Sequence, residues 1–173
     1  EINQVVGAFL LLGIAKVRIT GGEPLLRRDV SDLVRRLRQT GPNLDLAMTT
    51  NGLRLDDHLH SLSEAGLDRL NVSLDAIDPE TAREMAGRPL DTERVWAAVV
   101  RAKAMEFKVK LNTVIKKGVN ECQIMPLVQR CREAGIELRF IEYMDVGSSN
   151  GWRADEVVTA SEILDQISRI FPL

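Results

Sequence analysis

The chain has 173 residues, of which 45% are hydrophobic and 28% charged, as in an ordinary globular protein with one core. Its 23 Lys and Arg residues nearly balance its 25 Asp and Glu residues, and no basic tail or block of like charge indicates a nucleic-acid partner. The most apolar stretch, residues 5–14, is too short to span a membrane and reads as a core helix. We therefore expect a single domain, 1–173, with no membrane or nucleic-acid partner.

The predicted secondary structure alternates between helices and strands. Apolar spacing and end signals predict helices at 2–13, 29–40, 57–65, 79–87, 92–105, 124–134 and 160–170. The predicted strands are 16–20, 44–51, 69–75, 108–115 and 136–144. Asp29 and Thr159 are expected N-caps, the second in a capping box with Glu162. Gly41, Gly66 and Gly135 are expected to end three of the helices.

The first strand alternates between polar and apolar residues. Val17 and Ile19 are apolar, whereas Lys16, Arg18 and Thr20 are polar. A strand packed between two layers of helices is nearly continuously apolar. One face of this strand is therefore expected to meet something polar, and cations there suit an anionic ligand.

The later strands repeat this alternation, more weakly in 136–144, and it indicates the fold class. Their polar positions are Asp45, Thr49 and Asn51, then Asn71, Ser73 and Asp75, then Lys108, Lys110 and Asn112. The short connections predict parallel strands with helical crossovers. An open doubly wound sheet would press the strand cations against apolar helices, at a cost of several kcal/mol for each unpaired charge. We therefore predict an α/β fold, a partial β/α (TIM-like) barrel, with its ligand at the carboxyl ends of the strands.

The cysteines and histidines give no sign of a metal site. Cys122 and Cys131 form neither a CxxC pair nor part of a three-cysteine cluster. Cys131 falls on an apolar helical stripe and is expected to be buried. His58 and His60 have no nearby ligand partners and are interpreted as structural.

The predicted strand ends carry a distinctive set of segments. They are 17–29 (VRITGGEPLLRRD), 49–53 (TTNGL), 70–75 (LNVSLD), 109–114 (VKLNTV), 118–120 (GVN) and 139–147 (RFIEYMDVG). In this order and spacing they resemble the radical S-adenosylmethionine superfamily and, within it, the GTP 3′,8-cyclase family. GGEP alone would indicate only the superfamily, whereas the set covers nearly the whole chain.

The resemblance also implies that the chain is the central part of a longer protein. The chain lacks an initial Met and opens inside a predicted helix. The family's CxxxCxxC loop, which holds one [4Fe-4S] cluster, would precede Glu1. The three cysteines of a second cluster would follow Leu173. We therefore expect a barrel core without its first strand and cluster loop, no metal ligand in this chain, and no activity from the chain alone.

The resemblance implies a lyase of molybdenum cofactor biosynthesis that uses S-adenosylmethionine and [4Fe-4S] clusters. Its reaction would be the radical cyclisation of GTP to (8S)-3′,8-cyclo-7,8-dihydroguanosine 5′-triphosphate. The 5′-deoxyadenosyl radical would take the hydrogen from C3′, and the barrel would supply placement and exclude water. A cytoplasmic location and cyclic pyranopterin monophosphate synthase as pathway partner are also implied, and a homodimer is among the assemblies that the resemblance allows.

By position, the resemblance assigns S-adenosylmethionine to Gly21, Gly22, Glu23, Ser73 and Met144. Glycine lacks a Cβ atom, so the backbone of the turn would approach the cofactor closely. The competing interpretations are an ordinary strand-to-helix turn and a methionine that only fills the core.

The same resemblance assigns GTP to Arg18, Thr49 and Lys110, with Lys16 as a weaker addition. Lysine and arginine bring the donors and fixed charge that suit a triphosphate. Solvated strand ends and simple β propensity are the competing interpretations. No catalytic residue is assigned, because no general base stands out.

The sequence is also consistent with two other functions. A peptide-modifying radical enzyme would share GGEP but has less reason to carry Arg18 and Lys110 together. A non-catalytic anion-binding barrel would need no cluster ligands. The remaining polar and aromatic residues are interpreted as structural or solvated: Asn71, Asp75, Arg27, Arg28, Trp96 and Trp152.

Overall fold

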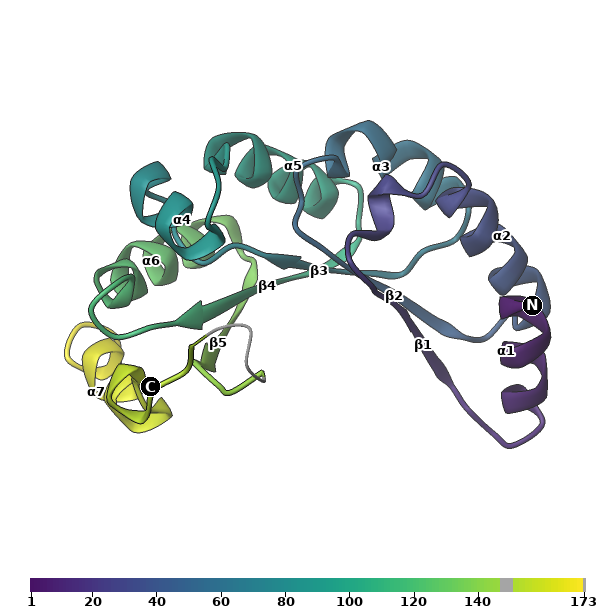
Figure 1. Cartoon of the computed structure of the whole chain (residues 1–173). Helices are drawn as coiled ribbons and strands as arrows, with labels where there is room; N and C mark the ends of the chain where they lie inside the picture. Colours follow the sequence, from purple (N-terminus) through teal and green to yellow (C-terminus); the bar gives the residue numbers. More distant parts are fainter. Residues whose placement is uncertain (147–150, 173) are drawn as a thin grey trace. The chain divides into compact units, whose positions relative to one another are not determined.

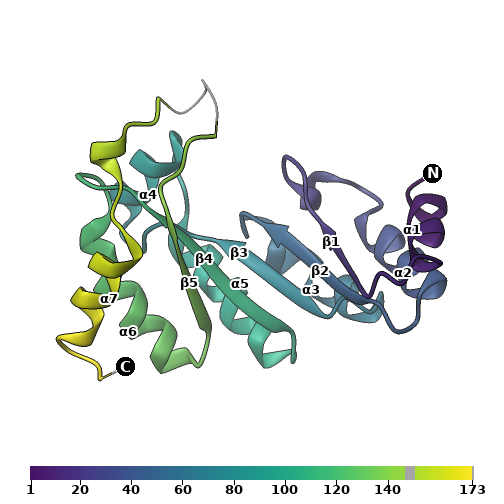
Figure 2. The same ribbon diagram turned by 90° about the horizontal axis from the view of Figure 1, so that it is seen from below.

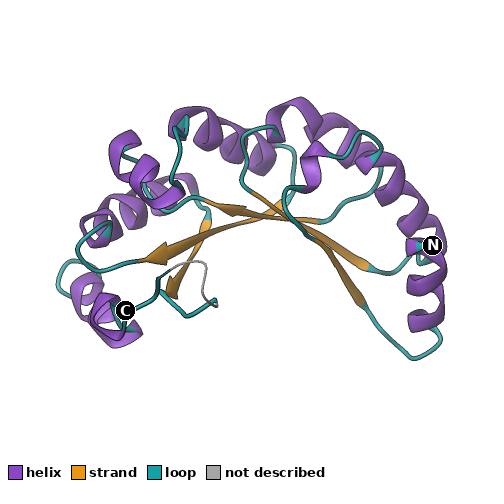
Figure 3. Cartoon of the chain, in the orientation of Figure 1, coloured by secondary structure: helices purple, strands orange, loops and turns teal. Residues whose placement is uncertain are grey.

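The computed structural model describes residues 1–146 and 151–172, and its helices and strands alternate along the chain (Figures 1 and 3). In order they are α1 (Ile2–Leu10), β1 (Lys16–Ile19), η1 (Pro24–Leu26), α2 (Val30–Thr40), β2 (Asp45–Thr50), α3 (Leu55–Glu64), β3 (Arg69–Ser73), α4 (Pro79–Ala86), α5 (Thr92–Ala104), β4 (Lys108–Ile115), η2 (Glu121–Gln123), α6 (Ile124–Ala134), β5 (Glu137–Glu142), η3 (Ala154–Glu156) and α7 (Ala160–Ser168). Gly147, the last residue of the segment 139–147, lies outside the described residues.

The strands form one parallel sheet in the order β1-β2-β3-β4-β5. Each strand pairs with the next strand along the chain, with a helix between the two. This is the strand order of a β/α barrel, whereas a doubly wound sheet reverses its order at a switch point. The predicted α/β fold with barrel-type connectivity is confirmed, and the open doubly wound alternative is wrong.

The described chain divides into two compact units. The first comprises Glu1–Val72 and Val95–Lys110, and the second comprises Ser73–Arg94 and Leu111–Leu173. In the first unit, α2, α3 and α5 lie along one side of the strands (Figure 1). Leu46 and Met48 of β2 are fully buried, and the apolar positions of α2 and α3 are buried as well. The opposite face of β2 carries Asp45 and Thr49, both half-buried, so the predicted alternation of this strand is confirmed.

The second unit has its own apolar cluster. Helix α6 packs against β5 and α7 (Figure 2). Ile115, Ile124 and Ile163 are among its buried members, and Phe140 of β5 packs against them. The capping box of α7 is confirmed, because Thr159 N donates to Glu162 Oε2 at 2.7 Å and Glu162 N donates to Thr159 Oγ1 at 3.3 Å.

Helix α1 differs from the prediction in its burial and its length. It was expected to be a core helix reaching residue 13, but it ends at Leu10 and buries only Val6 among its own residues. Phe9 is 49% exposed and Leu11, just beyond the helix, is 89% exposed. Its apolar residues follow helical spacing, but no described element covers most of them. None of the described helices is long and apolar enough to cross a membrane.

Two predicted helix ends need correction. Asp29 stands at the N-cap of α2, but its carboxylate makes no capping hydrogen bond. It accepts instead from Arg27 Nε at 2.7 Å and from Arg27 Nη2 at 3.0 Å, so Arg27 is also more than a solvated charge. Gly41 ends α2 with a φ of −139°, outside the left-handed region. Gly66 and Gly135, with φ of +86° and +61°, end their helices as predicted.

Candidate functional site

The two-glycine turn after β1 leaves open space beside its backbone. A Cβ atom built on Gly21 or Gly22 would meet no atom within 4 Å. Gly52, in contrast, has a φ of +76°, and its Cβ would lie 2.8 Å from Val95 and 2.9 Å from Val72. Packing therefore explains the glycine at position 52 but not the glycine at position 22. The open side of the turn fits a ligand that lies against the main chain.

The Glu23 side chain holds this turn against the end of β2. Its Oε1 accepts from Thr50 Oγ1 at 2.7 Å and from Leu25 N at 3.1 Å. Its Oε2 accepts from Asn51 N at 2.8 Å. Since the carboxylate is occupied within the protein, a contact between Glu23 and a cofactor would come from its main chain.

Arg18 lies on the polar face of β1, beside Ala47 of β2. Its side chain is exposed, and it makes no hydrogen bond or ion pair with any described residue. A guanidinium on a strand face beside a small side chain can reach an anionic ligand. The structure therefore leaves Arg18 available for the role predicted from the sequence.

Lys16 has a different environment at the amino end of β1. It lies opposite Asp45, which accepts a hydrogen bond from Arg69 Nε at 2.6 Å. The hydrogen bond from Arg69 lowers the pKa of the Asp45 carboxyl, and the charges of Lys16 and Lys108 lower it further. Lys16 therefore has a structural carboxylate beside it, which weakens the case for a role in GTP binding.

Thr49 and Lys110 are both half-buried on strands of the first unit. Thr49 lies beside the buried Asn71 in the β2–β3 register. On β4, Val109 and Leu111 are buried while Lys110 between them is only partly covered. Side chains alternate across a strand, so Lys110 lies on the face opposite that apolar core.

In the second unit, side-chain hydrogen bonds replace part of the backbone hydrogen-bond ladder between β3 and β4. Leu74 N donates to Asn112 O at 3.0 Å, as in a regular parallel pair. One step further, Val114 N donates to the carboxylate of Asp75 at 2.8 Å, and Thr113 Oγ1 donates to Leu74 O at 2.7 Å. Burial raises the pKa of the Asp75 carboxyl, and the Val114 hydrogen bond only partly offsets this effect. Asp75 therefore has the structural role expected for it.

Ser73 and Met144 are both accessible in this unit. Ser73, the last residue of β3, is exposed. Met144 follows β5 and is 53% exposed, so the interpretation of Met144 as a plain core residue is wrong. An exposed hydroxyl and an exposed thioether at strand ends are groups that a nucleoside can contact.

Asn120 is a residue of this region whose importance was missed. It is fully buried, and its Nδ2 donates to Asp75 O at 2.7 Å and to Val114 O at 2.8 Å. Its Oδ1 accepts from Lys116 N at 2.7 Å. The segment Gly118-Val-Asn120 stood out in the sequence, but nothing local indicated that its asparagine joins two strands.

A small charged group beyond the strand ends was also missed. Lys116 Nζ lies 3.2 Å from Glu156 Oε2 and 4.9 Å from the centre of the Tyr143 ring. The hydrogen bond to Glu156 raises the pKa of Lys116. Trp152 Nε1 donates to Tyr143 O at 3.1 Å, but the residue is 37% exposed, so it is less buried than the packing role expected for it.

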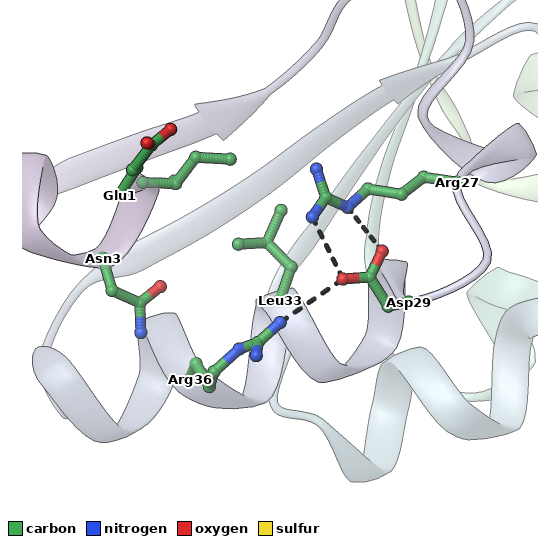
Figure 4. A pocket seen from close by; sticks show the side chains of 7 residues that line it. Glu1, Asn3, Arg27, Asp29, Leu33 and Arg36 are labelled. Atoms are coloured by element: carbon green, nitrogen blue, oxygen red, sulfur yellow. Dashed lines mark hydrogen bonds and ion pairs between the residues drawn. The ribbon is translucent and has the colours of Figure 1, made fainter.

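A pocket of about 490 Å³ lies between the start of α1 and the start of α2 (Figure 4). Arg27 and Arg36 both point toward Asp29 in its wall, and Glu1 and Asn3 line the other side (Figure 4). None of the site residues predicted from the sequence lines it. This pocket is therefore not the predicted ligand site.

The described residues do not fit an iron–sulfur cluster. Within residues 1–146 and 151–172, no group of three or more His, Cys, Asp or Glu side chains could hold a metal ion. Cys122 is exposed and Cys131 is buried, as predicted for the second thiol. Burial raises the pKa of Cys131 to about 11, which keeps it a thiol at neutral pH.

Comparison with known proteins decides the family. Residues 1–137, well over half of the chain, match the Radical SAM superfamily. The chain belongs to the radical SAM superfamily. Members of this superfamily use S-adenosylmethionine and a [4Fe-4S] cluster. No described residue of this radical SAM chain is assigned to the cluster.

The radical SAM chain is similar to proteins named GTP 3′,8-cyclase. It is 43% identical over 171 residues to that of Aquifex aeolicus (strain VF5), covering 99% of this chain and 53% of the relative. It is 44% identical over 174 residues to that of Xanthomonas campestris pv. campestris (strain 8004), covering 100% of this chain and 51% of the relative. The chain thus spans about half the length of these curated relatives.

Solved structures of other radical SAM enzymes share the fold. A radical SAM methyltransferase from Sphaerobacter thermophilus matches with a TM-score of 0.72 at 19% identity, covering 98% of this chain and 52% of that chain. Streptococcus suis SuiB bound to S-adenosylmethionine matches with a TM-score of 0.70 at 21% identity, covering 85% of this chain and 34% of that chain. At these identities the likeness confirms the fold.

Proposed function

We propose that the full-length protein is a GTP 3′,8-cyclase. It would convert GTP to (8S)-3′,8-cyclo-7,8-dihydroguanosine 5′-triphosphate in the first step of molybdenum cofactor biosynthesis. The observation that carries the proposal is the 43–44% identity to proteins of that name along the whole of this chain. The open glycine turn supports it from the structure, as does Arg18, which pairs with no described residue.

In this proposal the cofactor lies along the turn after β1. The backbone of Gly21, Gly22 and Glu23 meets the amino and carboxylate groups of S-adenosylmethionine, while Ser73 contacts its methionine portion. Met144, which is 53% exposed, packs on the adenine. When bound, S-adenosylmethionine supplies the radical that starts the cyclisation.

The substrate is held by charge on the polar strand faces. Arg18 and Lys110 bind the triphosphate through charge-assisted hydrogen bonds, and Thr49 adds a hydroxyl. Lys16 is the weakest of the four assignments, because Asp45 lies beside it. These residues position GTP and neutralise its charge, and none of them is assigned a proton transfer.

The reaction is tested with the full-length protein after anaerobic cluster reconstitution. GTP deuterated at C3′ is incubated with S-adenosylmethionine and a reductant, and the products are separated by liquid chromatography with mass detection. Chromatography is required because the cyclised product is an isomer of GTP. We expect deuterium in the 5′-deoxyadenosine that is released.

Two outcomes would contradict the proposal. Cleavage of S-adenosylmethionine that depends on a peptide and not on GTP would indicate a peptide-modifying enzyme. No binding of S-adenosylmethionine would indicate a non-catalytic anion-binding barrel.

The wider biological setting is part of the same proposal. The enzyme is proposed to act in the cytoplasm and to pass its product to cyclic pyranopterin monophosphate synthase. Addition of that synthase to the reaction should consume the cyclised product. We also propose that the enzyme forms a homodimer, which light scattering on the full-length protein tests.

A further inference from the structure

A positively charged surface surrounds the start of α2. Its members are exposed residues of one short segment: Leu26, Arg27, Arg28, Arg35 and Arg36. The two aspartates of the same segment leave two positive charges in excess, although the chain as a whole has a net charge of −2. We call these five residues the α2 basic surface. It contains none of the residues assigned to S-adenosylmethionine or GTP.

The arginines of the α2 basic surface are only partly neutralised within the described chain. Arg27 pairs with Asp29 at 2.7 Å, and Arg36 reaches the same carboxylate at 3.4 Å, so that one carboxylate serves two guanidinium groups (Figure 4). Arg35 pairs with Asp32. A guanidinium has five N–H donors, so each of these arginines can still bind a carboxylate from another molecule.

The α2 basic surface begins directly beside the glycine turn. Leu26 N donates to Glu23 O at 3.1 Å, and Arg27 N donates to Pro24 O at 3.0 Å. Pro24 and Leu25 are buried, so this short helical turn holds its exposed residues in place. Leu26 is 64% exposed and adds an apolar contact to a charged surface. A protein docked here would lie beside the main chain that is proposed to hold S-adenosylmethionine.

The proposed reaction consumes one electron for each S-adenosylmethionine that is cleaved. When the sulfonium C–S bond breaks, the sulfur of methionine keeps an electron pair and the carbon keeps a single electron. The bond itself supplies two of these three electrons, so a donor must supply the third. A donor protein has to dock close to the cofactor, because electrons transfer only over short distances between proteins.

We propose that the α2 basic surface docks an acidic one-electron carrier protein, which supplies the electron for the cleavage of S-adenosylmethionine. The inference rests on the proposed function. Carboxylates of the carrier pair with the arginines, and Leu26 makes the apolar contact, a combination typical of protein interfaces. The carrier is oxidised by one electron in each turnover. Charge attraction brings the two proteins together, so the association weakens as ionic strength rises.

The test uses the full-length, cluster-reconstituted protein, with a plant-type [2Fe–2S] ferredoxin as the acidic carrier. Arg28→Glu reverses one charge of the surface at a residue that pairs with no described residue. Lys103→Glu is the matched control, because Lys103 is an exposed cation on α5 that also pairs with no described residue. Calorimetric titration measures the binding of oxidised ferredoxin at low and high salt. Release of 5′-deoxyadenosine in the presence of GTP is measured with reduced ferredoxin and, separately, with dithionite.

We expect Arg28→Glu to affect the protein donor alone. Ferredoxin binding and the ferredoxin-driven rate at subsaturating ferredoxin should both fall about tenfold at low salt, because a carboxylate replaces a cation at the interface. The dithionite-driven rate and the affinities for S-adenosylmethionine and GTP should match those of the wild type. Arg28→Ala should give a smaller loss in the same direction, and Lys103→Glu should give none. High salt should reduce the difference between the variants.

Four results would count against these proposals. Equal ferredoxin binding by the wild type and Arg28→Glu would overturn the inference. An equal fall in the dithionite-driven rate would also overturn it, because the effect would then lie in the active site and not in docking. A wild type that reacts with dithionite but does not bind ferredoxin would overturn the inference and leave the proposed function intact. A wild type that cleaves S-adenosylmethionine with neither reductant would overturn the proposed function itself, and this inference with it.

Discussion

The Glu23 carboxylate and the Thr50 hydroxyl lie 2.7 Å apart and join the glycine turn after β1 to the end of β2. Asn51 N, 2.8 Å from the same carboxylate, strengthens this connection. The turn proposed to hold the cofactor and the strand that carries Thr49 are therefore fixed to each other by one side chain. A ligand that binds the turn and a ligand that binds beside Thr49 therefore depend on the same Glu23 hydrogen bonds.

Replacement of Glu23 with alanine should affect both stability and cofactor binding. Thr50 Oγ1 and two backbone N–H groups would lose their acceptor, so we expect the free energy of unfolding to fall by about 2–4 kcal/mol. S-adenosylmethionine affinity should fall at least tenfold, because the turn loses its support. Urea unfolding and calorimetric titration measure the two effects. Thr50→Val removes one of these three bonds together with the 3.1 Å bond from Gly52 N to Thr50 Oγ1, and it should give a smaller loss of affinity than Glu23→Ala. An equal loss of affinity would contradict the proposed connection.

Replacement of Gly22 with valine should weaken S-adenosylmethionine binding more than GTP binding. The described chain has room for the side chain, so the unfolding temperature should stay close to that of the wild type. Gly52→Val is the matched control, because its side chain would collide with Val95 and Val72 and should destabilise the protein. Titration of both nucleotides is the measurement. Equal loss of both affinities in Gly22→Val would mean that the turn is only structural.

Arg18→Ala and Lys110→Ala should each weaken GTP binding by about 1.5–3 kcal/mol, the range for a hydrogen bond to a charged group. S-adenosylmethionine affinity should stay nearly unchanged, and guanosine, which lacks phosphates, should show a smaller loss. Lys16→Ala serves as a matched cation change and should have the smallest effect, because Asp45 lies beside Lys16. Equal weakening for GTP and guanosine would contradict the triphosphate assignment.

Asp75→Asn should stabilise the protein at neutral and higher pH. Burial raises the pKa of Asp75 in the folded state, so the wild type loses stability as pH rises from about 4 through that pKa. An asparagine oxygen can still accept the Val114 hydrogen bond without a buried charge. The advantage of the variant should disappear below about pH 4, where aspartate is protonated in both states.

Asp45→Asn provides a control of opposite sign for this pH dependence. The hydrogen bond from Arg69 lowers the pKa of Asp45, so its carboxylate stabilises the folded state above the ordinary pKa of aspartate. The variant should therefore be less stable than the wild type at neutral pH, and the difference should fade as pH falls through the lowered pKa. Thermal unfolding from pH 3 to 8 compares the two variants. The same sign for both would contradict the assigned causes.

Most of the elements could be predicted because their signals are local. The alternation in Val109, Lys110 and Leu111 places β4 and its polar face, and the Thr159–Glu162 pair places the start of α7. Gly135 ends α6 with the left-handed backbone that its position predicted. Each of these patterns depends only on residues that are close in the sequence. Tertiary contacts did not override them.

The errors and omissions arise from side chains that act at a distance. Asp29 occupies the expected cap position, but nearby guanidinium groups take its carboxylate, so its pKa falls through the hydrogen bond with Arg27. Arg38 donates to Gly66 O at 2.8 Å and Leu44 O at 2.7 Å, and no spacing rule indicates such contacts. The exposed face of α1 is a further example, because an apolar pattern states what can be buried but not what covers it.

The hydrogen bond from Asn120 to the main chain of Asp75 spans 45 residues of sequence. A strand end secured from so far along the chain cannot close until the intervening α4, α5 and β4 have formed. The rim of strands β3 and β4 should therefore be among the last parts of the protein to fold and the first to open. In hydrogen exchange, the amides of Val114 and Lys116 should exchange together with the segment around Asn120. Ligand-binding competence is then acquired late in folding, after most of the sheet has formed.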